Sequence, residues 1–388
     1  MPIAANPVDP MGTDETYMPP SRSPWAETWH LLRKNRMAFS GLLIFMVFFA
    51  VAVAGLAVTS GKDPFLDPAR VRLQEKLLPP LASPNTDTLR AEELPALGIY
   101  ILGTDDLGRD VFARMLQGAW VSLTVGFVAV GIAVGIGILL GGFSGYYGRQ
   151  YIQMGHILFW LLLIAAVVMA FQQALSAGVF LAIAAIAGWL CKKQHDRRLS
   201  PLPVYLKWLA LPTIKVDTLI MRAVDIMLCF PSFFLILTVV ALLPPSIYNI
   251  MVIIGLTSWM GTTRFVRAEF LSLREQDFVA AARALGISDA RIIFRHIMPN
   301  AVAPVLVSAT LGIASAMLTE AGLSFLGFGV PPPHATWGNI LSDGKAFIFD
   351  APWLTFAPGL VILVVVLAFN LFGEGMRDIL NPKLRERN

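Results

Sequence analysis

The chain has 388 residues, of which 56% are hydrophobic and only 14% are charged, and its formal net charge is +4. A soluble globular domain carries about 25% charged residues, so this composition excludes one. It also excludes a disordered or collagen-like chain, and two cysteines exclude a disulfide scaffold. The composition therefore predicts an integral membrane protein.

The first long apolar run covers residues 39–58, and Arg33, Lys34 and Arg36 precede it. About 20 apolar residues cross the roughly 30 Å hydrocarbon layer as a helix. Basic residues before the run favour a cytoplasmic N-terminus, and the preceding residues lack the order of a signal peptide. We expect a cytoplasmic segment at 1–37, an uncleaved anchor helix at 38–60 and an extracytoplasmic loop at 61–117.

Further apolar runs predict the remaining membrane spans. They lie at 119–143, 157–190, 219–243, 247–261, 301–328 and 353–373. The run 157–190 is too long for one ordinary span and has Gln172 and Gln173 at its middle, which favours a hairpin of two short spans. One long tilted or interfacial helix is the alternative. With the hairpin the chain has eight spans, which returns the tail 376–388 to the cytoplasm, the side on which most Lys and Arg residues fall.

The loop 264–300 has a helical pattern outside the predicted membrane. Its apolar positions follow one face of a helix, at Phe278, Ala281, Ala282 and Leu285. Gly286 stands where a left-handed residue ends a helix, and Ser288 can cap a second helix that Pro299 limits. The loop therefore predicts two short helices joined by a glycine bend. Periodicity alone does not decide whether the apolar face packs on the chain's own helices or on a cytoplasmic partner.

Several motifs of this chain occur together in one known family. They are FVAAARALG at 278–286, RIIFRHIMPN at 291–300, GTDDLGRDV at 103–111, GYYG at 145–148, MRAVD at 221–225, EAGLSFLG at 320–327, WG at 337–338 and NLFGEGMRD at 370–378. The first two resemble the EAA loop of ABC importer permeases. The whole set resembles the oligopeptide/dipeptide/nickel permease family, in the branch that pairs with a second, different permease.

The resemblance implies an all-α polytopic membrane protein with a six-helix, type I (MetI-like) permease core in residues 118–375. Residues 149–216, with the expected hairpin, interrupt the family pattern as an insertion. The coupling loop would be 264–300. One departure concerns the glutamate that names the EAA loop, because its position holds Ala280 here. Any polar contact of that glutamate with an ATPase is therefore absent.

The resemblance also implies an ATP-driven importer built from two permeases, two ATP-binding subunits and an extracytoplasmic substrate-binding protein. This chain would be a non-catalytic permease in a bacterial inner membrane, with both termini cytoplasmic, no bound metal or cofactor and no nucleic-acid partner. ATP and Mg would bind the partner subunits, since this chain has no phosphate-binding G-x-x-x-x-G-K-[ST] loop. Peptides are the expected substrates, with nickel complexes or peptide-like antibiotics as alternatives.

The resemblance assigns roles to named positions. Contact with the ATPase is expected at Asp277, Phe278, Ala281, Ala282, Arg283 and Gly286. Glu320 and Asn370 are candidates for the translocation path or gate, although Glu320 fits a structural polar pair equally well and Asn370 favours a bond to a neighbouring helix. Asp105, Arg109 and Trp337 are candidate contacts with the binding protein.

Local spacing suggests structural roles for other polar residues. Thr104, Asp105 and Asp106 can cap a helix that starts near Leu107. Two pairs have the spacing of ion pairs on one helix face, namely Asp110 with Arg114 and Arg222 with Asp225.

Other function classes leave different traces in a sequence. An ion-gradient-driven secondary transporter would show inverted repeats and paired broken helices, and no repeat relates the two halves, although Pro231, Pro304 and Pro358 can kink helices. A membrane enzyme has no support, because G-x-S-x-G and H-E-x-x-H motifs are absent.

Overall fold

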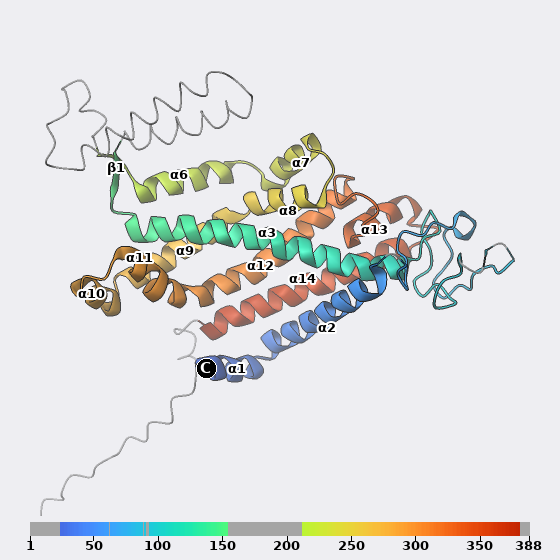
Figure 1. Cartoon of the computed structure of the whole chain (residues 1–388), viewed down its shortest axis with the longest axis horizontal. Coiled ribbons are helices and arrows are strands. Elements are labelled where there is room, and N and C mark those ends of the chain that lie inside the picture. Colours follow the sequence, from blue (N-terminus) through green and yellow to red (C-terminus); the bar gives the residue numbers. More distant parts are fainter. Residues whose placement is uncertain (1–23, 62, 88, 91–92, 154–211, 381–388) are drawn as a thin grey trace, which may run out of the picture.

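The computed structural model describes residues 24–61, 63–87, 89–90, 93–153 and 212–380. They form an elongated bundle whose helices run mainly along the long axis (Figure 1). In chain order the helices are α1 (Pro24–Lys34), α2 (Arg36–Thr59), η1 (Leu73–Glu75), α3 (Val111–Tyr147), α6 (Val216–Cys229), α7 (Ser232–Leu242), α8 (Ile247–Leu256), α9 (Trp259–Arg274), α10 (Asp277–Ala284), α11 (Asp289–Arg291), η4 (Ile292–Ile297), α12 (Met298–Phe325), α13 (Trp337–Gly344), η5 (Lys345–Phe347) and α14 (Trp353–Leu380).

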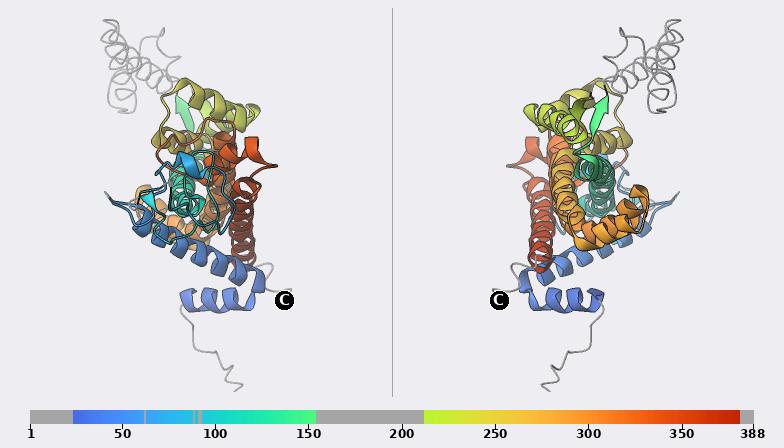
Figure 2. Two further views of the ribbon diagram at one scale, coloured as in Figure 1. Left: turned by 90° about the vertical axis from the view of Figure 1, so that its right-hand side faces the viewer. Right: turned by 90° about the vertical axis from the view of Figure 1, so that its left-hand side faces the viewer.

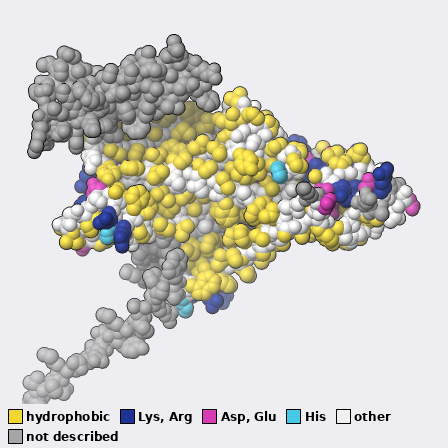
Figure 3. Space-filling view, in the orientation of Figure 1, with side chains coloured by type: hydrophobic (Ala, Val, Ile, Leu, Met, Phe, Trp, Pro, Cys, Tyr) yellow, Lys and Arg dark blue, Asp and Glu magenta, His cyan; other side chains and the backbone are white. Residues whose placement is uncertain are grey.

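Within the described residues, four helices are long and apolar enough to cross a bilayer. They cover Arg36–Thr59, Val111–Tyr147, Pro304–Phe325 and Trp353–Ile379. Each coincides with an apolar run of the sequence, because a run of about 20 residues at 1.5 Å per residue matches the hydrocarbon thickness. On the face shown in Figure 3, hydrophobic side chains cover the middle of the bundle and charged side chains gather at its two ends. The all-α, polytopic membrane fold is therefore confirmed.

Two of the predicted spans are not single straight helices. The run 219–243 is a pair, α6 and α7, bent by 80°. The break falls at Pro231, which lacks an N–H and disfavours a helical residue before it. The run 247–261 divides between the 10-residue α8 and the start of α9. There the hydroxyls of Thr257 and Ser258 donate to the last carbonyls of α8, with distances of 2.7 Å to the Ile253 oxygen and 2.6 Å to the Ile254 oxygen.

The central helix is α3, which packs against α2, α8, α9 and α12. Its contact with α9 is very close. An added Cβ on Gly137 would lie 2.6 Å from the Thr262 side chain, and one on Gly141 would lie 2.6 Å from the Thr263 carbonyl oxygen. Seen along the long axis, α2 crosses the bundle obliquely (Figure 2), and Gly41 and Gly375 allow α2 and α14 to approach at backbone distance.

The two ends of the bundle carry different elements (Figure 1). One end holds α10, α11 and a two-stranded antiparallel ladder of β1 (Tyr151–Gln153) and β2 (Pro212–Lys215), while α1 packs against α2 and α14 along the lower edge of the bundle in Figure 1. The other holds α13 and the loop before α3. The two strands lie near the two ends of the segment 149–216, the expected insertion, so this segment leaves and re-enters the bundle at one place. The predicted hairpin at 157–190 lies outside the described residues.

Candidate functional site

The loop between α9 and α12 contains the predicted glycine bend. α10 ends at Ala284, and Gly286 has a φ of +72°. The Gly286 N–H donates to the Arg283 carbonyl (2.9 Å), and the Ile287 N–H donates to the Ala282 carbonyl (3.1 Å). These two bonds are the Schellman arrangement, which satisfies the last carbonyls of a helix through a left-handed residue. The direction of the chain after α10 is therefore fixed by Gly286.

The second helix of this loop differs from its prediction. Ser288 has the backbone position of an N-cap but its side chain makes no capping bond. α11 continues without interruption through the π-helical segment η4 into α12, so Pro299 does not end a helix. Pro299 is the second residue of α12 and lies within this continuous helical run. In the turn just before it, the Met298 N–H bonds to the Ile293 carbonyl five residues earlier.

The apolar face of α10 is divided between the chain's own core and the surface. Val279 and Ala282 are 0% and 4% exposed and pack with Ile292 and its neighbours. The prediction that Ala282 contacts a partner is wrong, because the side of α10 that faces the core contains Val279 and Ala282. Phe278 and Leu285 are 40% and 80% exposed.

The other predicted contact residues of α10 also lie at the surface. Asp277, Ala281, Arg283 and Gly286 are all exposed. α10 therefore presents a surface of small and apolar side chains, bordered by Asp277 and Arg283, beyond the apolar belt of the bundle. We call Phe278, Ala281 and Leu285 the α10 outer face.

Before α3 the motif 103–111 forms a compact, hydrogen-bonded loop instead of a helix. Asp105 N–H donates to the Arg109 carbonyl (3.1 Å), and Gly108 has a φ of +71°. The helix begins at Val111, with the Asp110 carboxylate accepting the Phe112 N–H at 2.9 Å. The prediction of a helix starting near Leu107 is therefore wrong, because the left-handed glycine and the backbone bridge turn the chain before a helix can begin.

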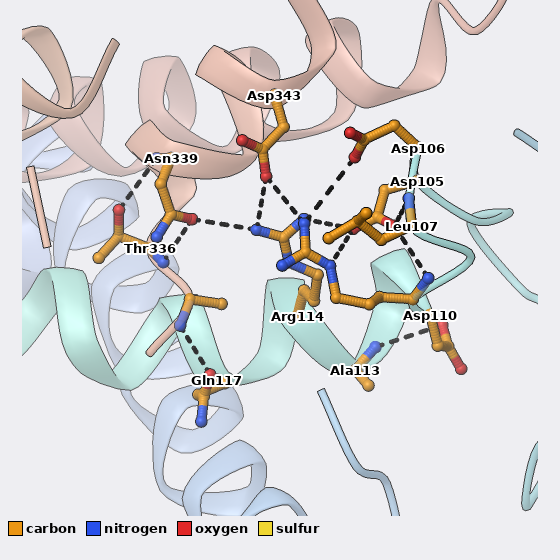
Figure 4. Close-up of polar contacts among 12 residues, drawn as sticks. Asp105, Asp106, Leu107, Asp110, Ala113, Arg114, Gln117, Thr336, Asn339 and Asp343 are labelled. Carbon is orange, nitrogen blue, oxygen red and sulfur yellow. Dashed lines mark hydrogen bonds and ion pairs between the residues drawn. The ribbon is translucent and has the colours of Figure 1, made fainter. Parts of the chain in front are cut away.

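An ion-pair network joins this loop to α13 (Figure 4). Asp105 Oδ2 accepts from Arg109 Nε at 2.7 Å and from Arg114 Nη1 at 2.5 Å. Both arginines also reach Asp343 Oδ2, at 3.2 and 2.8 Å. The expected pair of Asp110 with Arg114 does not form, because Asp110 caps the helix while the Arg114 guanidinium turns toward Asp105 and Asp343.

Two of the three candidate contacts with a binding protein are buried. Asp105 is 0% exposed and Trp337 is 2% exposed. The Trp337 indole donates to the Met115 carbonyl at 3.1 Å. As surface contacts these two predictions are wrong, since Asp105 is buried against Arg109 and Arg114 and Trp337 attaches α13 to α3. The Arg109 side chain keeps 15% of its surface exposed.

Oxygens of Asp105, Asp106 and Asp343 lie within 4.8 Å of one another. The guanidinium groups of Arg109 and Arg114 lie among them and supply the counter-charge (Figure 4). Partial burial, followed by the negative charges of Asp105 and Asp343, raises the pKa of Asp106. The group is therefore best described as a structural ion-pair network.

Glu320 and Asn370 differ in their surroundings. Glu320 is 1% exposed and accepts from Ser324 Oγ at 2.7 Å and from Ser122 Oγ at 3.5 Å. The Ser324 bond lies within α12, and the Ser122 hydroxyl connects α3 to α12. Asn370 is half-buried in α14, and its side chain has no hydrogen-bond partner in the part of the chain that the structure describes. The described residues therefore do not contain the expected bond of Asn370 to a neighbouring helix.

The predicted pair of Arg222 and Asp225 is present on α6, with 3.6 Å between Nη1 and Oδ2. Sequence reasoning missed that Asp225 also accepts from Arg264 of α9 at 2.7 Å. Both arginine side chains are more than half exposed, so this group is a surface network that links α6 to α9.

Comparisons with known proteins agree with the motifs and the fold. A family model described as binding-protein-dependent transport system inner membrane component matches residues 204–386, and one described as the N-terminal TM domain of oligopeptide transport permease C matches residues 23–80. The dipeptide transport system permease protein DppC of Alkalihalophilus pseudofirmus is 35% identical over 97% of both chains.

Two further relatives cover nearly the whole length. DppC of Haemophilus influenzae is 32% identical over 96% of this chain and 99% of its own. The oligopeptide transport system permease protein OppC of Bacillus subtilis is 29% identical over 99% of this chain and 97% of its own. Long apolar helices, the motifs and these full-length matches agree, and the chain therefore belongs to the family of binding-protein-dependent transport system inner membrane components, as a multi-pass permease subunit of the ABC importer type.

Proposed function

We propose that this permease forms one half of a peptide translocation pathway in a bacterial inner membrane, and that ATP-hydrolysing partner subunits drive it. Peptides are favoured because the relatives that match its full length are named as dipeptide and oligopeptide transport permeases. The second half of the pathway would be a different, homologous permease. A substrate-binding protein on the outer side would deliver the peptide.

The observation that carries the proposal is the α10 outer face. Leu285 is 80% exposed and Phe278 is 40% exposed, on a helix whose opposite face is fully packed. Burying such a side chain is worth about 1.5–3 kcal/mol, so a partner surface would gain stability from covering both. The fixed bend at Gly286 sets the direction of α10, which suits a helix that inserts into a groove of an ATPase subunit.

If an ATPase subunit docks at α10, ATP hydrolysis and transport are carried out by different subunits. ATP and Mg would bind the partner subunits, and this chain would supply the pathway and no catalytic group. Because α10 and the strands that flank the expected insertion share one end of the bundle, that end is assigned to the cytoplasm together with both termini. The ion-pair network and α13 are then on the outer side, where the partly exposed Arg109 remains a candidate contact with the binding protein.

Two polar residues of the spans have separate proposed roles. Glu320 is assigned a structural role beneath α13, since hydroxyls of Ser122 and Ser324 bond to both of its oxygens. Asn370 is half-buried without a partner in the described chain, so its amide is free to contact the second permease or the substrate. Asn370 is therefore the better candidate for the pathway.

Uptake measurements test the substrate and the docking together. A strain lacking this permease, complemented with the wild-type chain, is given peptides of graded length and, separately, nickel. Restored uptake of peptides alone supports the proposal, and restored uptake of nickel alone contradicts it. Leu285→Glu should abolish uptake and co-purification of the ATPase subunits, because a carboxylate would be buried on docking. Phe349→Glu is the matched control, since Phe349 is 95% exposed at the other end of the bundle.

A further inference from the structure

We propose that α3 is the element that carries the movement of α10 to the outer side, and that Arg274 and Asp343 are the positioning residues that fasten its two ends. This inference rests on the proposed docking of an ATPase at α10. It adds to that function a route through the fold and the residues on which the route depends.

The inner fastening, which we call the inner joint, consists of Arg274, Tyr146 and Asp289. Arg274 is 7% exposed, and its Nη1 donates to the carbonyls of Gly145 (3.1 Å) and Tyr146 (3.0 Å). These carbonyls belong to the last turn of α3, where a helix has no partner of its own for them. The Tyr146 hydroxyl in turn donates to Asp289 at 2.6 Å.

The residues of the inner joint include one shortly before α10 in the chain and one shortly after it. Arg274 is the last residue of α9, directly before α10, and Asp289 is the first residue of α11, directly after the glycine bend. In addition, the Arg283 guanidinium of α10 lies 5.3 Å from the centre of the Tyr146 ring. A displacement of α10 therefore pulls or pushes on the end of α3 through three separate contacts.

Between its ends α3 cannot slide freely along α9. Gly137 and Gly141 leave no room for a Cβ against Thr262 and Thr263, so the two helices interlock at backbone distance. An α-helix of 37 residues is about 55 Å long at 1.5 Å per residue. One continuous, closely supported helix thus connects the level of α10 with the opposite end of the bundle.

The outer fastening, which we call the outer joint, attaches α13 to the first turns of α3. Arg114 Nη2 lies 2.8 Å from Asp343 Oδ2, and the Trp337 indole donates to the Met115 carbonyl at 3.1 Å. The Gln117 side-chain oxygen accepts the Ala335 N–H at 2.7 Å. Since α13 also packs against α12 and α14, a shift of α3 moves α13 relative to the other outer helix ends.

The test uses the intact importer in proteoliposomes, with Arg274→Gln, Asp343→Asn and the double variant. The readouts are co-purification of the ATPase subunits, basal ATPase activity, and stimulation of that activity by loaded binding protein. We expect assembly and basal activity to persist while stimulation falls by about 2- to 30-fold, the scale for substitutions along a coupling route. The double variant should be no worse than the more affected single variant, because both interrupt one route.

Matched controls are Arg222→Gln, whose side chain is 75% exposed in a surface pair, and Asp350→Asn, which is exposed beside α14. Both should leave stimulation unchanged, and Arg274→Lys, which keeps a donor, should retain part of it. Normal stimulation in either single variant, or losses that multiply in the double variant, would overturn the proposal. If Arg274→Gln does not assemble, Asp343→Asn decides alone. A wild-type complex that shows no peptide-dependent ATPase activity would instead refute the proposed function.

Discussion

Substituting Gly286 isolates the backbone requirement of the α10 bend. An added Cβ would meet no atom within 4 Å, so Gly286→Val introduces no clash. The φ of +72° is the whole cost, which is about 1–3 kcal/mol for a non-glycine residue and highest for a β-branched one. The two bonds that close the bend are each worth about 0.5–1.5 kcal/mol net. The strain and the bonds are therefore of similar size, and we expect the bend to open for a large fraction of the time.

The assay is ATPase activity and peptide transport by the reconstituted importer. Gly286→Val should lower transport and separate ATP hydrolysis from the presence of substrate, whereas Gly286→Asn should be milder because asparagine tolerates a left-handed backbone. Gly261→Val is the control, since Gly261 also has open space around its Cβ position but lies within the right-handed helix α9. Normal, coupled transport by Gly286→Val at normal expression would refute the role of the bend.

Three further predictions concern stability. Asp105→Ala should lower the free energy of unfolding by about 1.5–3 kcal/mol, because Arg109 and Arg114 lose their bonds to Asp105 while Asp343 still supplies a counter-charge. Thermal unfolding of the purified chain would show no such loss if the network were incidental. Asp106→Asn should stabilise the chain at pH 7 by less than about 1 kcal/mol, since burial and neighbouring charges raise the pKa of Asp106 above its unfolded value and its ionisation therefore costs stability. That advantage should vanish as the pH falls below about 4, and a constant advantage across pH would contradict the sign. Gly141→Leu should separate α3 from α9 and prevent expression, whereas Gly131→Leu, at an open position of the same helix, should not.

Features that depend on neighbouring residues could be predicted from the sequence. The bend at Gly286 follows from a helical pattern that ends one residue before a glycine, and the structure closes it with bonds between residues 282 and 287. The long spans follow from apolar length alone. The pair on α6 follows from a three-residue spacing that places Arg222 and Asp225 on one helix face.

Features that depend on distant residues could not be predicted in this way. Asp105 belongs to a family motif. Its partner Arg114 also pairs with Asp343, which lies more than 200 residues further along the chain. Neither the motif nor the spacing shows that this network buries Asp105 together with Trp337. The buried face of α10 could not be predicted for a related reason, since Val279 packs against Ile292 and its neighbours on the other side of the bend. The bend at Pro231 could not be predicted from apolar length, because one apolar run there contains two helices.

The most direct test of the account is photocrosslinking from position 285 in the assembled importer within native membranes. Leu285 is 80% exposed on the α10 outer face, so a photoreactive residue placed there should capture an ATP-hydrolysing subunit, and the yield should change when nucleotide is added. A probe at Phe349, at the opposite end of the bundle, should capture no such subunit. An active importer in which position 285 never links to a nucleotide-binding protein would contradict the account.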